Sequence, residues 1–153
     1  MGAIFNDELK RLRGHFMEMG IDASEQIYQA TKAFTEHDPA LANQVLTTDN
    51  KINDEEVSLE KEALKLMALQ QPVASDFRKI ISILKASSDI ERLGDYATHI
   101  ARAAINLSDR EHNEQIEGQI EKMMLIVREM LERVLDAYAQ TNEQAAYEVA
   151  NED

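Results

Sequence analysis

The sequence predicts an all-α protein, an antiparallel bundle of long helices. Only five of the 153 residues are glycine and two are proline, whereas residues that favour helices are abundant. Apolar residues recur every three or four positions along most of the chain, the spacing of a helix with one buried face. Helices of about 30 residues would each be about 45 Å long. Short turns between such helices favour an antiparallel bundle.

The first helix is expected to begin after Asn6, a residue type that caps helices well. Gly14 and Gly20 weaken this helix but do not clearly end it. Its apolar stripe consists of Leu9, Leu12, Phe16, Met19, Ala23, Ile27, Ala30 and Phe34.

The second helix is predicted from Asp38 and Pro39, a capping residue followed by a proline at the first helical position. It should run to about Gln70 and end at the break before Pro72. Its inward residues are expected to be Leu41, Val45, Ile52, Leu59, Ala63 and Leu66.

The third helix should open near Ser75 and Asp76 and end around Asn106, where the polar stretch 108–113 makes the next turn. Its core-facing residues are expected to be Phe77, Ile80, Ile83, Leu84, Ile90, Ile100 and Ala104.

A fourth helix follows, and Thr141 with Gln144 fits a capping box that would begin a fifth. The apolar stripe of the fourth helix is predicted to be Ile116, Ile120, Met123, Val127, Met130, Leu131 and Val134.

The chain also contains a possible internal repeat. Residues 19–49 and 123–153 align at an offset of 104, with Met19 on Met123 and Glu25 on Glu129. Each copy reads as a helix, a capped turn and the start of another helix. Chance similarity between two amphipathic hairpins is the alternative to a true repeat, which would continue beyond Asp153.

Composition excludes several classes of function. The net charge of −13 argues against nucleic acid and against adsorption on an anionic membrane, since both need a basic surface. The absence of cysteine excludes disulfides, thiolate catalysis and soft metal sites. The N-terminus lacks the apolar segment of a secretory signal, and we expect a soluble, cytoplasmic protein.

Two acidic faces are the main candidate site. Glu91 and Asp95 lie four residues apart on one face of the third helix, where like charges cost roughly 0.2–0.5 kcal/mol. Gly94 between them adds a further penalty of about 1 kcal/mol relative to alanine; a close approach of another helix would explain it. Asp49 and Asn53 share a face of the second helix, together with Glu56.

The geometry of the hairpin links the two faces. With the turn centred on Gln71, the position level with Asp49 on the third helix is residue 93, between Glu91 and Asp95. Carboxylate and amide oxygens suit hard cations such as Mg²⁺, Ca²⁺, Mn²⁺ or iron, and a cation would reverse the like-charge penalty. The alternative is a solvated acidic face that binds nothing.

No catalytic set is evident. The four histidines, His15, His37, His99 and His112, are scattered along the chain, and only His99 is near an acidic face. None is preceded by glutamate at the Glu-x-x-His spacing of di-iron bundles. This weakens, without removing, the alternative of a metal-carboxylate bundle with a redox or storage function.

One segment has a specific resemblance. The stretch 71–78, QPVASDFR, is followed by Leu84-Lys85 and by DIERLGD at residues 89–95. In this combination and spacing, the chain resembles the PhoU family of regulators associated with bacterial phosphate-specific transport.

The resemblance implies two tandem three-helix bundles. Residues 1–107 would form the first, and residues 113–153 the opening of an incomplete second. It also implies metal ions at the acidic motifs, and it does not distinguish among iron, Zn, Mg, Mn and Ni. The ligands would be Glu91 and Asp95 of the third helix and Asp49 and Asn53 of the second. Glu56 would lie beside them. Many relatives have Asp where this chain has Asn53, which would weaken a metal cluster. Asp153 would be the first acid of the second site.

The implied role is that of an adaptor and not an enzyme. It would repress the phosphate-starvation response and control phosphate uptake through the transporter's ATP-binding subunit and a sensor histidine kinase, reaching the membrane only through them. Because an apolar helix in an incomplete repeat lacks partners, we also expect a homodimer or a helix-exchanged oligomer.

Overall fold

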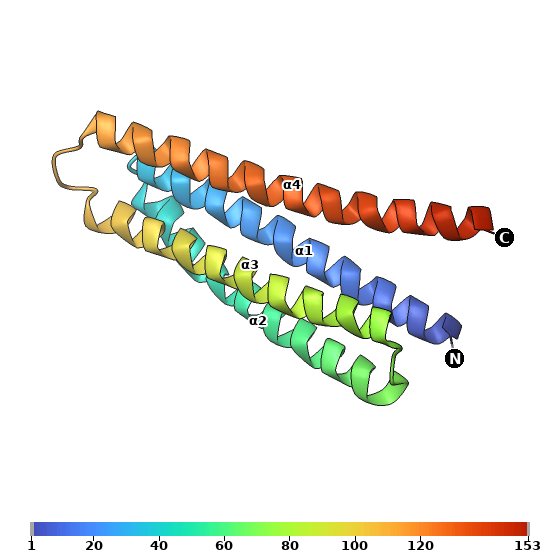
Figure 1. Cartoon of the computed structure of the whole chain (residues 1–153). Helices are drawn as coiled ribbons and strands as arrows, with labels where there is room; N and C mark the ends of the chain where they lie inside the picture. The colour runs from blue at the N-terminus through green and yellow to red at the C-terminus, as the bar shows by residue number, and fades with distance from the viewer. Residues whose placement is uncertain (1, 153) are drawn as a thin grey trace.

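Four long helices make up the structure, a computed structural model that describes the backbone of residues 2–152 and the side chains of residues 4–140. The helices are α1 (Gly2–Thr35), α2 (Pro39–Gln70), α3 (Ala74–Asn106) and α4 (Glu114–Glu152). They run alternately up and down, so that the α1–α2 and α3–α4 connections lie at one end and the α2–α3 turn at the other (Figure 1). The predicted all-α antiparallel bundle is confirmed.

Helices α1, α2 and α3 pack against one another around a single core. All eight residues of the predicted α1 stripe are buried, as are Ile52 and Leu59 of α2 and Ile80 and Ile83 of α3. Phe77 is an exception: it is 45% exposed, because the first turn of α3 extends past the well-buried part of the bundle. Periodicity therefore predicted the core except near a helix end.

The turns follow the capping residues. The Asp38 carboxylate accepts a hydrogen bond from the Leu41 backbone N–H at 3.0 Å, and Pro39 occupies the first turn of α2. Gln71 closes α2 in the left-handed conformation, with a φ of 43° and its N–H bonded to the Met67 carbonyl. The predicted start of α1 after Asn6 is wrong. The helix begins at Gly2 and brings Phe5 into the core, where it is 8% exposed.

Helix α4 packs along α1, and in the described part of the chain its backbone does not come close to that of α2 or α3. Leu131 and Leu135 are buried at this contact. A polar network crosses it as well: the Ser24 hydroxyl donates to Glu132 and accepts from Arg128 Nε, both at 3.1 Å. Helix α4 is thus held against the bundle mainly by its packing on α1.

The apolar stripe predicted for the fourth helix is wrong at four of its seven residues. Ile116, Met123, Met130 and Val134 are exposed, because the face toward α1 is rotated by about one residue from the predicted stripe. The side chains on that face are Ile120, Met124, Val127, Leu131, Leu135 and Tyr138.

The fifth helix predicted from Thr141 does not begin there, since α4 continues through Glu152. The equivalent turn after α1 contains Pro39, which cannot continue a helix; its counterpart in the aligned repeat is Glu143, which can. Asp153 lies outside the described residues. No helix among those described has the length and apolarity needed to cross a membrane.

Gly20 is the glycine on which the α1–α4 contact depends. A Cβ at this position would lie 2.6 Å from Leu135 Cδ2, whereas a Cβ at Gly14 would meet nothing within 4 Å. Alanine should therefore help at Gly14, by about 1 kcal/mol of helix propensity. At Gly20 the same gain should be offset by displacement of Leu135, an overpacking cost of about 1–3 kcal/mol.

We predict that Gly20→Ala is less stable than Gly14→Ala by about 1–3 kcal/mol. Urea unfolding of the two variants beside the parent chain measures this difference. Equal stability of the two alanine variants would contradict the assigned packing of α4 on α1.

Candidate functional site

The predicted acidic residues lie at matching heights on α2 and α3. A Cβ placed on Gly94 would be 3.6 Å from the Ile52 side chain and 3.9 Å from Asp49 Oδ1. Asp49 is thus level with residue 94, one position from the level predicted from the hairpin. An added Cβ would make only an ordinary van der Waals contact at 3.6 Å, so α2 leaves room for a methyl group at Gly94 and does not require glycine there.

Gln26 of α1 joins the two helices and was not predicted. Its buried Nε2 donates to Asp49 Oδ1 at 3.1 Å and to the Gly94 carbonyl at 3.3 Å. The sequence did contain one indication that Gln26 is buried: it lies between Ala23 and Ala30 on the apolar stripe of the first helix. A polar side chain on such a stripe needs buried hydrogen-bond partners, and here one partner is a residue of the acidic site.

The acids repel one another electrostatically. Burial raises the pKa of Glu91 above its usual value, and the charges of Asp95, Glu56 and Asp49 raise it further. Burial likewise raises the pKa of Glu56, with Glu60 and Asp95 adding to the effect. In the described part of the chain, no ion pair with a basic side chain offsets these charges. The site therefore carries uncompensated negative charge at partly buried positions.

Asn53 reduces that charge and also positions an acid. Its amide lies 3.5 Å from Asp49 Oδ2 and donates toward it, while the other oxygen of Asp49 accepts from Gln26. An aspartate at position 53 would instead add repulsion beside Asp49. This arrangement leaves the Asn53 carbonyl oxygen as a neutral donor for a cation.

The donor chemistry fits a hard cation, since it consists of carboxylate and amide oxygens. The carboxylates are nevertheless spread out. Among the described residues, no three of Asp49, Glu56, Glu91 and Asp95 have ligand atoms within 4.8 Å of one another. The arrangement suits an ion such as Mg²⁺ that keeps several waters and is bound through one or two carboxylates.

The histidines are not all isolated, contrary to expectation. His37 and His112 stack beside Glu117 at the connection end of the bundle. The two histidines are 75 positions apart in the sequence (112 − 37 = 75), so no local spacing could reveal their proximity. His99, expected near the acids, is exposed, and its ring lies 6.3 Å from that of Tyr96.

Fold and site together define a class: all-α bundle proteins with an acidic face shared by adjacent helices. Comparison with known protein families identifies one family within this class. The model for the PhoU domain matches residues 16–104, more than half of the chain, and the chain belongs to the PhoU family.

The sequences of individual relatives align with nearly the whole length of this chain. The chain is 41% identical to the "Phosphate-specific transport system accessory protein PhoU homolog" of Pseudomonas putida, over 97% of this chain and 58% of that protein. The homolog from Pseudomonas aeruginosa is 36% identical over 97% of this chain and 62% of its own length. The chain thus spans about three fifths of these relatives.

Solved structures match the fold. The crystal structure of PhoU from Pseudomonas aeruginosa superposes with a TM-score of 0.86 at 36% identity, covering 96% of this chain and 70% of that one. The phosphate transport system regulatory protein PhoU from Streptococcus pneumoniae gives a TM-score of 0.82 at 30% identity, covering 96% and 69% respectively. The predicted family and fold are both confirmed.

The raised pKa of Glu91 predicts a pH effect with a definite sign. A carboxyl whose pKa is higher in the folded chain loses stabilisation as the pH rises through that pKa. With chelator present, Glu91→Gln should therefore gain stability relative to the parent as the pH rises from about 5 to 8. Thermal unfolding at the two pH values measures this gain.

Glu129→Gln, which changes an exposed glutamate on α4, is the control and should show no such gain. A Glu91→Gln variant that loses stability relative to the parent at the higher pH would contradict the repulsion inferred at this site.

Proposed function

We propose that this chain is part of a regulatory accessory protein of phosphate-specific transport, one that represses the phosphate-starvation response and adjusts phosphate uptake. The observation that carries the proposal is the similarity over 97% of the chain to relatives named as accessory proteins of that system. The chain acts as an adaptor and not as an enzyme.

The proposed partners are the transporter's ATP-binding subunit and a sensor histidine kinase. An acidic surface with a net charge of −13 is suited to basic patches on protein partners and repelled by anionic lipid. We therefore place the protein in the cytoplasm, reaching the membrane through its partners alone.

A metal ion is proposed at the acidic face. Glu91 and Asp95 of α3 and Asp49 of α2 would hold it, with Glu56 and the Asn53 carbonyl at its edge. The uncompensated charge and the raised pKa of Glu91 support this assignment. A bound cation would supply the positive charge that this part of the bundle lacks.

Self-association through α4 is also proposed. On one part of α4, Met123, Met130 and Val134 are 57%, 60% and 61% exposed. Large apolar side chains at such spacing favour burial against another surface, and a second copy of the chain can offer the same face in return.

The regulatory role can be tested with the chain itself. In a strain that lacks its own accessory protein, expression of this chain should reduce a phosphate-starvation reporter in phosphate-rich medium. It should also retain the purified ATP-binding subunit in a pull-down at physiological salt. Retention of neither the ATP-binding subunit nor the kinase, with the reporter unchanged, would contradict the proposal.

Self-association can be tested separately by light scattering. We expect a dimer for the parent chain and a monomer for Met130→Glu/Val134→Glu, because charges there would be buried in the interface. Leu64→Glu/Leu69→Glu, at exposed leucines of α2, is the matched control and should remain a dimer. A monomeric parent chain would contradict association through α4.

A further inference from the structure

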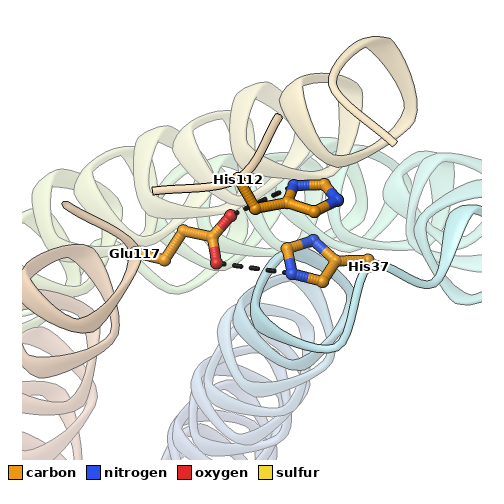
Figure 2. A group of neighbouring side chains, drawn as sticks. All are labelled: His37, His112 and Glu117. Carbon is orange, nitrogen blue, oxygen red and sulfur yellow. Dashed lines mark ion pairs between the residues drawn. The ribbon is translucent and has the colours of Figure 1, made fainter. Parts of the chain in front are cut away.

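Three side chains from separate segments meet at the connection end of the bundle (Figure 2). His37 comes from the α1–α2 turn, His112 from the α3–α4 connection and Glu117 from the first turns of α4. His37 Nε2 lies 3.4 Å from Glu117 Oε2, and His112 Nδ1 lies 3.4 Å from Glu117 Oε1. The two imidazole rings stack with their centroids 3.5 Å apart.

These distances resemble those between ligands of one metal ion. Ligands at about 2.0–2.1 Å from a tetrahedral Zn²⁺ are about 3.3 Å from each other, close to the two separations of 3.4 Å. One ligand atom from each of the three side chains lies within 4.8 Å of the others. Because an imidazole binds a metal through a lone pair in its ring plane, the two stacked rings would have to rotate apart for all three side chains to bind one ion.

The backbone holds each ligand in place. His37 has a φ of 56°, the left-handed conformation, in the turn that the Asp38 cap closes. Asn113 caps α4 by accepting hydrogen bonds from the backbone N–H groups of Gln115 and Ile116, which fixes the turn that presents Glu117. The side chains are also partly shielded, at 32%, 31% and 16% exposure for His37, His112 and Glu117.

The ligand types identify the class of metal. Two imidazoles and one carboxylate suit Zn²⁺ and neighbouring transition metals, whereas Mg²⁺ and Ca²⁺ prefer oxygen ligands alone. Zn²⁺ imposes no ligand-field geometry and accepts three protein ligands with water as a fourth. This set differs in chemistry and residues from the acidic face between α2 and α3.

We propose that His37, His112 and Glu117 form a Zn²⁺-class metal site that ties the start of α4 to the α1–α2 turn. Among the described helices, the backbone of α4 otherwise lies close only to that of α1. A metal at this end would add a link between α4, the α3–α4 connection and the turn before α2. The proposal is independent of the role in phosphate transport.

Titration with Zn²⁺, followed by competition with a chromophoric chelator, tests this site in the full chain. His37→Asn removes a ligand while keeping a residue type that adopts the left-handed conformation. His112→Asn changes a residue of the connecting segment. Each should weaken Zn²⁺ binding at this site at least about tenfold, since even loss of outer-shell support costs 10–100-fold. Co²⁺ should give visible absorption bands in the parent chain that both variants lose.

Two controls separate this site from other histidines and acids. His15→Asn removes a histidine that also pairs with a glutamate, Glu62, at 2.7 Å, and should leave the Co²⁺ bands unchanged. Glu91→Gln/Asp95→Asn should leave them unchanged as well. Absence of Co²⁺ bands from the parent chain, or their loss in the acidic variant but not in His112→Asn, would overturn the proposal and leave His37, His112 and Glu117 as an ion-pair cluster.

Discussion

Buried apolar side chains between α2 and α3, Ile52 at the level of Gly94 among them, set the register of the two helices, and the acidic site depends on that register. Ile52 is 2% exposed, and burying such a side chain contributes about 1.5–3 kcal/mol. Repulsion between Glu91 and Asp95, as an i,i+4 pair, costs only about 0.2–0.5 kcal/mol. The apolar contact therefore outweighs the repulsion and holds the carboxylates at one height. Gln26 reinforces the same register through its hydrogen bonds to Asp49 and Gly94.

Much of this arrangement could be predicted because it depends on regular spacing. A helix repeats every 3.6 residues, so counting predicted most of the buried stripes of the first three helices, and it placed Asp49 level with residue 93, within one position of the observed residue 94. Contacts between particular side chains of different helices could not be predicted from residue spacing. The sequence suggested a close helix approach at Gly94, but a Cβ fits there. A Cβ does not fit at Gly20, because Leu135 packs over Gly20.

In helix α4, the spacing of apolar residues did not predict the buried face correctly. Its apolar residues cover more than one face, so periodicity could not decide which face meets α1, and the predicted stripe mixed buried Leu131 with exposed Met130. The contact is set instead by Gly20 and by the Ser24 network. His37 and His112 were missed for a related reason: turns at one end of an antiparallel bundle come together however far apart they are in the sequence.

Negative charge placed at one height by apolar packing is the central feature of this account, and a metal ion is its proposed counterpart. The most direct measurement is the metal content of protein purified without chelators, by elemental analysis. We predict that bound metal persists in His37→Asn/His112→Asn, which lacks two ligands of the second proposed site, and is lost from that variant when Glu91→Gln/Asp95→Asn is added. No metal in His37→Asn/His112→Asn, or an equal content after the two acidic changes are added, would contradict a metal ion at the acidic face.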